Sequence, residues 1–447
     1  MKALFGWLVV LLMIPVALPA PASAQEGVDP LAIAQAAVDH LIAGDYEAAA
    51  ADFDAQMIQA VPDAALQQVW EQLVQQAGPL QEQGTAQTAT QGEFTIVTYR
   101  LLFERAAFEI QITISGAGQV AGLFLRPAAT EPALPWEPPT YADPSAFVER
   151  EIVLNEGSEW ELPGVLSMPQ GEGPFPAVVL VHGSGPNDRD ETIGPNKPFA
   201  DLAYGLASQG IAVLRYDKRT LVHGTAMVEA GDLTVNDETV DDALAAVALL
   251  RQTDGIDPDR VFVLGHSLGG YLAPRIASRD PNLTGLIILA GSTRSLVDSV
   301  RMQSRYLAML DGELSEADEA ALAELETVLQ ATENVQPGDD PATLLFNTPA
   351  SYWLDLKEYD PAALAAELAL PMLILQGGRD YQVTLDDFAG WEAALGHRDD
   401  VTLRVYPDLN HGFFVSGEGP GAPAEYEQPG HVAAEVIEDI ARWILAH

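Results

Sequence analysis

The segment Val261–Gly270, with the sequence VFVLGHSLGG, constrains the fold more than any other part of this chain. Its four leading apolar residues are too few for a helix and are typical of a strand buried on both faces. They run directly into residues 265–269 (GHSLG), a G-x-S-x-G motif, and residues 271–277 then have the apolar spacing of a helix. A strand, a tight turn and a helix are the context in which this motif presents a reactive serine, here Ser267. Gly265 and Gly269 keep side chains out of the place where strand and helix backbones approach each other.

The amino terminus has the pattern of a secretory signal peptide over residues 1–24. A short positive start is followed by an apolar run from Ala3 to Leu18 and by Ala22-Ser23-Ala24, a small-residue cleavage site that predicts a mature protein beginning at Gln25. The alternative is an uncleaved membrane anchor, but the apolar run is short for a bilayer span. We therefore expect a secreted or extracytoplasmic protein without stable membrane insertion after cleavage.

The amino-acid composition argues against several kinds of catalytic chemistry and of binding partner. The chain has no cysteine, so disulfides, a lipid-modified cysteine and a thiol nucleophile are excluded. A formal net charge of -43 repels nucleic acid and anionic membranes and keeps the protein soluble. We therefore expect no nucleic-acid partner, while the oligomeric state stays open.

The pattern along the chain divides it into a small α+β domain at residues 29–127, a proline-rich linker at residues 128–146 and a larger domain at residues 147–447. The first domain is predicted to form helices over 31–41, 46–58 and 64–76, followed by strands over 94–103, 106–115 and 119–125. It contains one histidine, His40, and no carboxylate cluster at metal-ligand spacing. Either a substrate-recruiting module or an inert one fits this domain.

The larger domain alternates short buried strands with amphipathic helices. Eight strands are predicted, at 150–154, 162–168, 177–181, 211–216, 261–264, 285–290, 371–375 and 401–406. The first two form a hairpin, and helices connect the later six, so right-handed crossovers make most of the sheet parallel with helices on both faces. About eighty residues, 292–370, interrupt this alternation and predict a helical cap over the strand ends. Aromatic residues of the cap, Tyr352, Trp353 and Tyr359, fit either a substrate pocket or the cap's own core.

A serine hydroxyl needs a base within hydrogen-bonding distance to become a nucleophile. Among eight histidines, His411 follows the last strand, and Asp380 follows the strand before it, so both lie at the same sheet edge as Ser267. The order Ser267, Asp380, His411 is the one expected for a triad on such a sheet. Asp408 is the nearest competitor of Asp380. Three other histidines are poorer bases because none follows the last strand in the right direction: His223, His266 and His431.

The oxyanion of an acyl-transfer intermediate needs backbone N–H donors at this edge. Leu268, directly after the nucleophile, is expected to supply one donor. The loop after strand 177–181 supplies the other, from Ser184 or alternatively from Gly183. Charged residues in the same region are expected to form ion pairs that fix the loop, or else to contact substrate directly: Asp188, Arg189, Asp190, Glu191, Lys197, Arg215, Asp217, Lys218 and Arg219.

Residues 182–199 (HGSGPNDRDETIGPNKPF), 214–220 (LRYDKRT) and 265–270 (GHSLGG) resemble the α/β-hydrolase superfamily, and more narrowly bacterial serine esterases related to dienelactone hydrolases. The resemblance covers residue 150 to the carboxyl terminus. Dienelactone hydrolases usually carry cysteine as nucleophile, and Ser267 departs from that pattern, which argues against a dienelactone substrate. The first domain is similar to a small domain of unassigned role found ahead of such hydrolases.

Together these features predict an exported serine esterase that acts on a small-molecule ester without a metal or organic cofactor. Ser267 would form the acyl-enzyme, with His411 as base and Asp380 orienting it. A serine peptidase or an acyltransferase on the same fold is the nearest alternative. A non-catalytic binding protein of the cell envelope is the alternative from another class.

Overall fold

A computed structural model describes residues 29–447 except 62, 92–93, 129–135, 232, 311, 341–342, 347, 416 and 418. The predicted signal peptide lies outside the described residues. The chain divides into two compact units, Met1–Ala133 and Leu134–His447. Among the described residues, no helix combines the length and the apolar character needed to cross a bilayer.

The first unit packs helices on one face of an antiparallel sheet. Alternate residues of the long strands, among them Val97, Tyr99 and Ile112, are buried against the helices. The sheet has the order β1-β3-β4-β5, with β2 also paired to β3. Its elements are α1 (Pro30–Ala43), α2 (Tyr46–Ala49), α3 (Ala55–Ala60), α4 (Asp63–Ala77), β1 (Leu80–Gln83), β2 (Gln87–Gln91), β3 (Phe94–Phe103), β4 (Ala107–Ile114) and β5 (Val120–Ala128).

The helix predicted over 46–58 is two helices, α2 and α3, because the chain between them pairs with a strand. Phe53 forms a bridge to Val120, the backbone N–H of Asp54 donates to Val120 O at 3.0 Å, and that of Val120 donates to Asp52 O at 2.7 Å. These tertiary hydrogen bonds replace the helical ones over one turn. The small α+β character predicted for this unit is confirmed.

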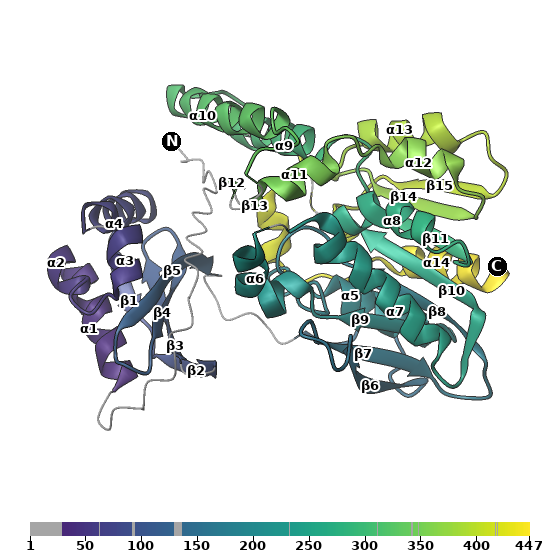
Figure 1. Ribbon diagram of the computed structural model, residues 1–447, viewed down its shortest axis with the longest axis horizontal. Coiled ribbons are helices and arrows are strands. Elements are labelled where there is room, and N and C mark those ends of the chain that lie inside the picture. The colour runs from purple at the N-terminus through teal and green to yellow at the C-terminus, as the bar shows by residue number, and fades with distance from the viewer. Residues whose placement is uncertain are drawn as a thin grey trace. The chain divides into compact units, whose positions relative to one another are not determined.

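The second unit is built on an eight-stranded sheet with the order β15-β14-β11-β10-β8-β9-β7-β6 (Figure 1). All eight predicted strands are present, and β10, which leads to Ser267, lies between β8 and β11 and is parallel to both. The antiparallel pairs of this sheet are those that β7 forms with β6 and with β9. The strands are β6 (Phe147–Leu154), β7 (Leu162–Pro169), β8 (Phe175–Val181), β9 (Ala212–Tyr216), β10 (Ile256–His266), β11 (Gly285–Leu289), β14 (Met372–Gly377) and β15 (Val401–Tyr406).

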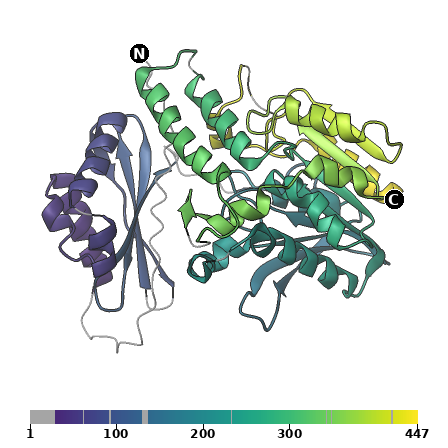
Figure 2. The same cartoon turned by 45° about the horizontal axis from the view of Figure 1, so that its top comes forward.

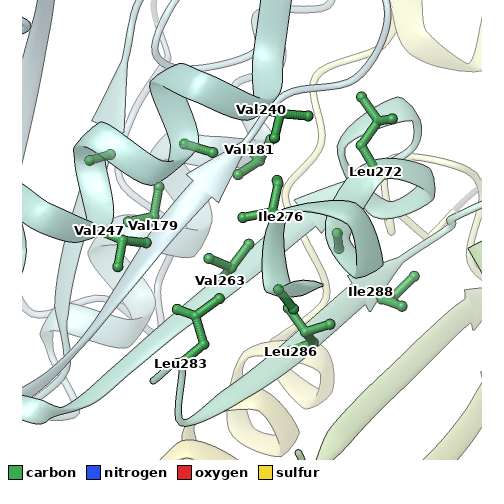
Figure 3. Packing of buried hydrophobic residues seen from close by; sticks show 14 of the residues in the cluster. Val179, Val181, Val240, Val247, Val263, Leu272, Ile276, Leu283, Leu286 and Ile288 are labelled. Carbon is green, nitrogen blue, oxygen red and sulfur yellow. The ribbon is translucent and has the colours of Figure 1, made fainter. Parts of the chain in front are cut away.

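Helices cover both faces of this sheet, which confirms the predicted fold class. One face packs against α7 and α8, where Val247, Ile276 and Leu272 meet strand residues such as Val263 (Figure 3). The other face packs against α5 and α14. The helices of this core are α5 (Pro198–Ala207), α6 (Arg219–Ala230), α7 (Asp241–Arg251), α8 (Leu268–Arg279), α13 (Leu385–Leu395) and α14 (Ala434–Ala446), with a 3-10 turn η2 (Pro423–Glu427).

The segment 292–370 forms a mainly helical insertion between β11 and β14 (Figure 2). Its two long helices are joined by Arg301 of α9, which contacts Glu326 and Glu333 of α10, each at 2.9 Å. The hydroxyl of Tyr359 donates to Tyr271 O of α8 at 2.9 Å, so this aromatic fixes the cap to the core. The elements are α9 (Leu296–Ala308), α10 (Glu316–Glu333), β12 (Leu344–Leu345), β13 (Thr348–Pro349), α11 (Ala350–Leu356) and α12 (Pro361–Glu367).

The helix predicted over 236–251 begins with a turn of different geometry. Residues Asn236–Val240 form a π-helical turn, η1, and α7 starts only at Asp241. Such turns insert one extra residue and are frequent at functional sites. Here η1 carries Glu238, a buried carboxylate.

Candidate active site

Ser267 follows β10 on a turn whose backbone is strained. Its φ of 52° and ψ of -115° are unusual for a residue with a side chain. The turn is held by its own N–H, which donates to Leu289 O at 2.9 Å. A Cβ on Gly265 would lie 2.2 Å from Gly269 O, and one on Gly269 would lie 2.1 Å from Val181 O. Only glycine fits at these two positions, as the sequence predicted.

His411 and Asp380 are brought together at the same end of the sheet. His411 Nδ1 donates to Asp380 Oδ2 at 2.7 Å, and both residues are buried. Asp380 Oδ1 also accepts the backbone N–H groups of Gln382 and Val383, at 2.8 and 2.9 Å. Because a carboxylate only accepts hydrogen bonds, the proton of the neutral imidazole lies on Nδ1. Nε2 of His411 is therefore free to accept a proton.

His266, the residue before the nucleophile, connects the three loops of this edge. Its Nε2 donates to His411 O at 2.9 Å, and its Nδ1 lies 2.8 Å from Glu191 Oε2. Burial alone would lower the pKa of His266, but the Glu191 carboxylate and these hydrogen bonds raise it above its ordinary value. The Glu191 carboxylate near Nδ1 and the His411 carbonyl that accepts from Nε2 both favour the protonated ring. Such a ring acts as a link between loops and leaves His411 as the candidate base.

The backbone N–H of Gly183, the alternative oxyanion donor in the sequence, is already hydrogen-bonded to Glu191. The backbone N–H of Gly183 donates to Glu191 Oε1 at 2.6 Å in a buried contact. Burial opposes ionisation of Glu191, yet the His266 ring beside it and the Gly183 N–H lower its pKa overall. This contact argues against Gly183, the alternative to Ser184, as an oxyanion donor, because its N–H already donates to a buried carboxylate.

Two backbone N–H groups remain suited to an oxyanion. Leu268 is the first residue of α8, where no preceding turn supplies a carbonyl acceptor. Ser184 N has no protein acceptor among the described residues. A Cβ built on Gly183 would lie 3.2 Å from Ser267 Cβ, so the Gly183–Ser184 peptide lies beside the nucleophile.

The Ser267 hydroxyl makes no hydrogen bond to another described residue, whereas His411 and Asp380 are hydrogen-bonded to each other. Catalytic hydrogen bonds are often long or absent before substrate binds. The contact between Ser267 and His411 Nε2 is accordingly part of the proposal below.

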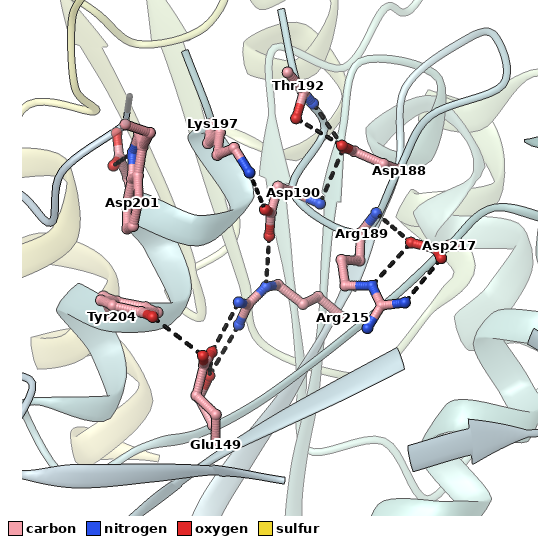
Figure 4. A network of polar contacts seen from close by, with 12 residues as sticks. Glu149, Asp188, Arg189, Asp190, Thr192, Lys197, Asp201, Tyr204, Arg215 and Asp217 are labelled. Atoms are coloured by element: carbon pink, nitrogen blue, oxygen red, sulfur yellow. Dashed lines mark hydrogen bonds and ion pairs between the residues drawn. The ribbon is translucent and has the colours of Figure 1, made fainter. Parts of the chain in front are cut away.

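The charged residues around the loop form ion pairs with one another (Figure 4). Arg215 contacts Asp190 at 2.9 Å and Glu149 at 2.8 Å. Arg189 holds both carboxylate oxygens of Asp217, and Lys197 contacts Asp190 at 2.8 Å. The interpretation that these residues fix the loop is thus favoured over direct substrate contact.

One pair near the site was not recognised from the sequence. Lys218 Nζ lies 2.7 Å from Glu238 Oε1 and donates to Gly183 O at 2.9 Å, with both side chains almost fully buried. Lys218 is among the charged residues expected to fix the loop, whereas no role is expected for Glu238 from its position in the sequence. Glu238 stands in an acidic segment beside Asp237, Asp241 and Asp242, so the sequence does not single it out.

A cavity of about 250 Å³ lies between the cap and the loop after β14. It is lined by Asp380, by Tyr306 of α9 and by Tyr381, and the two tyrosine rings stack with centroids 5.3 Å apart. Neither Ser267 nor His411 lines it, so the cavity lies beside the reacting atoms rather than over them.

The amino-acid sequence matches known protein families and relatives. Residues 174–418 match the hydrolase family described as serine aminopeptidase, S33, and residues 34–123 match a family of unknown function, DUF3887. Esterase EstD of Thermotoga maritima is 41% identical over 410 residues, which are 91% of this chain and 93% of that protein. A monoacylglycerol lipase of Mycolicibacterium smegmatis is 26% identical over 285 residues, 61% of this chain and 89% of that protein.

Among solved structures, Est1E from Butyrivibrio proteoclasticus aligns with a TM-score of 0.43 and 17% identity, covering 66% of this chain and 99% of that one. The match to EstD is longer than the second unit alone, so it includes residues of the first unit as well. The family match covers more than half of the chain and contains β8, β10 and both loops that carry Asp380 and His411. The chain therefore belongs to the α/β-hydrolase superfamily and, within it, to the serine aminopeptidase family of hydrolases.

Proposed function

We propose that this hydrolase cleaves carboxylic esters through an acyl-enzyme formed on Ser267. The observation that carries the proposal is the strained turn bearing Ser267 at the same sheet edge as a buried His411–Asp380 pair. The full-length similarity to an esterase supports the ester as the substrate class.

In the proposed reaction, Ser267 Oγ attacks the ester carbonyl carbon while His411 Nε2 takes the hydroxyl proton. Asp380 holds the tautomer in which Nε2 can accept and stabilises the imidazolium that forms. The N–H groups of Leu268 and Ser184 bind the oxyanion. His411 returns the proton to the departing alcohol, then takes one from water, which attacks the acyl-enzyme and releases the acid.

The family description makes an aminopeptidase the second candidate. Such an enzyme must bind the substrate's ammonium group with a carboxylate that is not already neutralised. The buried carboxylates around Ser267 are committed: Asp380 to His411, Glu191 to His266, and Glu238 to Lys218. This pairing favours an uncharged ester over a peptide amino terminus.

Hydrolysis of p-nitrophenyl esters, from acetyl to long acyl chains, tests the proposal with the wild-type protein and Ser267→Ala. We expect turnover by the wild type and a fall of at least about 10³-fold in the variant. Aminoacyl p-nitroanilides are measured in parallel. Hydrolysis of anilides but not of esters would replace the esterase with the peptidase, and equal ester hydrolysis by both proteins would rule out Ser267 as nucleophile.

Export is proposed separately, from the pattern of residues 1–24. The mass of the protein recovered outside the cytoplasm after expression in a bacterial host tests it. A mature chain beginning at Gln25 is expected. Full-length protein retained in the cytoplasm would contradict export without affecting the proposed chemistry.

A further inference from the structure

The peptide unit between Gly183 and Ser184 is held at its carbonyl by a buried cation. Gly183 O accepts Lys218 Nζ at 2.9 Å and also Asn187 Nδ2 at 3.2 Å. In a trans peptide the C=O and the following N–H point in opposite directions. A carbonyl directed at Lys218 therefore directs the N–H of Ser184 away from Lys218.

Lys218 is itself fixed by a chain of buried contacts that reaches the cap. Its Nζ lies 2.7 Å from Glu238 Oε1, and Glu238 Oε2 accepts the hydroxyl of Tyr352 at 2.8 Å. Tyr352 belongs to α11 of the cap, and Glu238 belongs to the π-helical turn η1. All three side chains are buried, so the contacts are shielded from solvent.

We propose that Lys218 is a positioning residue that orients the Ser184 N–H toward the oxyanion, and that Glu238 and Tyr352 hold it in place. This inference rests on the proposed function and adds to it a group that touches neither substrate nor reacting atoms. Rotation of the peptide would turn an N–H toward the Lys218 ammonium and remove an acceptor from a buried charge. Such a loss is costly, so the orientation is fixed before substrate binds.

The arrangement also connects the cap to the chemistry. Because Tyr352 contacts Glu238, a shift of α11 changes what holds Lys218 and hence the Ser184 N–H. The neighbouring cap aromatic Tyr359 donates to Tyr271 O instead and has no such connection. The two tyrosines therefore offer a matched comparison within one cap.

The test uses the full-length protein with two neutralised pairs, Lys218→Met/Glu238→Gln and Arg219→Met/Asp242→Asn. Changing both partners avoids an unpaired buried charge. Arg219 and Asp242 form a buried ion pair next to Lys218 in the sequence and provide the control, since neither contacts Gly183. Each protein is assayed for kcat and KM on an ester and for the Ki of a trifluoromethyl ketone, which forms a tetrahedral oxyanion adduct with a serine.

We expect the Lys218 pair to lower kcat and to raise the ketone Ki, each by about 10²-fold, because one oxyanion donor is lost. KM should change little, and Lys218→Arg should recover part of the loss. The control pair should lower thermal stability without changing the ketone Ki. A folded Lys218 pair whose kcat and ketone Ki match those of the control pair would overturn the positioning role, as would a rise in KM alone.

If the Lys218 pair does not fold, Tyr352→Phe and Tyr359→Phe decide the matter. Each removes one buried hydroxyl from the cap, and only Tyr352→Phe is expected to raise the ketone Ki, by roughly 3- to 10-fold. An unchanged Ki in Tyr352→Phe overturns the proposal. Ester hydrolysis by wild type and its loss in Ser267→Ala are established first. A wild type inactive on esters overturns the proposed function as well, whereas an active wild type confines any failure to Lys218.

Discussion

Replacement of Asp380 by asparagine isolates what the carboxylate does for His411. Asp380 accepts four hydrogen bonds: Oδ1 from the N–H groups of Gln382 and Val383, and Oδ2 from His411 Nδ1 and Gln376 Nε2. In Asp380→Asn the backbone donors keep the amide oxygen at the Oδ1 position. The amide NH2 group then faces His411 and Gln376, both of which donate in the wild type.

The conflict with His411 is relieved when the ring changes tautomer, with Nδ1 accepting and Nε2 carrying the proton, and the conflict with Gln376 is relieved by a flip of the Gln376 amide. An Nε2 that carries a proton cannot take one from Ser267, so kcat falls while the fold is kept. Loss of the correct tautomer in a serine triad costs about 10⁴-fold in kcat, equivalent to roughly 5.5 kcal/mol of barrier at 25 °C.

The assay is kcat and KM for p-nitrophenyl acetate, with Asp408→Asn as the control. Asp408 lies on the same loop as His411 but is exposed, and it was the competing candidate in the sequence. We expect Asp408→Asn to keep wild-type kcat and Asp380→Asn to unfold at nearly the wild-type temperature. An Asp380→Asn protein with kcat within tenfold of wild type would refute the tautomer argument, and loss of activity in Asp408→Asn would reassign the orienting carboxylate.

Three further outcomes follow from particular residues. Gly265→Ala should destabilise the protein by about 3 kcal/mol or more in urea unfolding, because its Cβ would lie 2.2 Å from Gly269 O. Gly224→Ala is the control and should be neutral, because no atom lies within 4 Å of its Cβ. Burial lowers the pKa of His182 from its ordinary value of 6.5 to about 4. Between these two pH values the unfolded chain binds more protons than the folded chain, so the free energy of unfolding should rise with pH across this window. Wild type should gain ~3 kcal/mol more than His182→Gln there, and equal gains would contradict the buried neutral histidine. A chain beginning at Leu134, which keeps the hydrogen bond from Trp136 Nε1 to Asp201 Oδ1, should retain ester kcat/KM within about threefold, and inactive but folded protein would show that the first unit is needed.

The fold was predictable wherever local patterns and chain order agree. The strand before Ser267 and the helix after it were clear because apolar runs and glycines leave few alternatives. The order of Ser267, Asp380 and His411 predicted a common sheet edge, and the His411–Asp380 contact is present. Polar strands such as β1 and β2 were missed, since their glutamine- and threonine-rich sequences lack the apolar alternation of a strand.

The polar contacts around the site could not be obtained from patterns alone. Lys218 and Glu238 lie on different elements, and only the tertiary fold brings their charges to 2.7 Å. Gly183 stayed open as the alternative to Ser184 because the acceptor of its N–H, Glu191, lies eight residues further on in a loop without periodicity. Buried ion pairs of this kind depend on geometry that no sequence period encodes.

The role of Ser267 as the nucleophile is tested most directly by the site at which a fluorophosphonate labels the mature protein, mapped by peptide mass spectrometry while ester hydrolysis is followed. We expect one adduct per chain, on Ser267, with activity lost in proportion to labelling and no adduct in Ser267→Ala. Full labelling with activity retained, or an adduct on another residue that accounts for the loss, would contradict the assignment of Ser267 as the nucleophile.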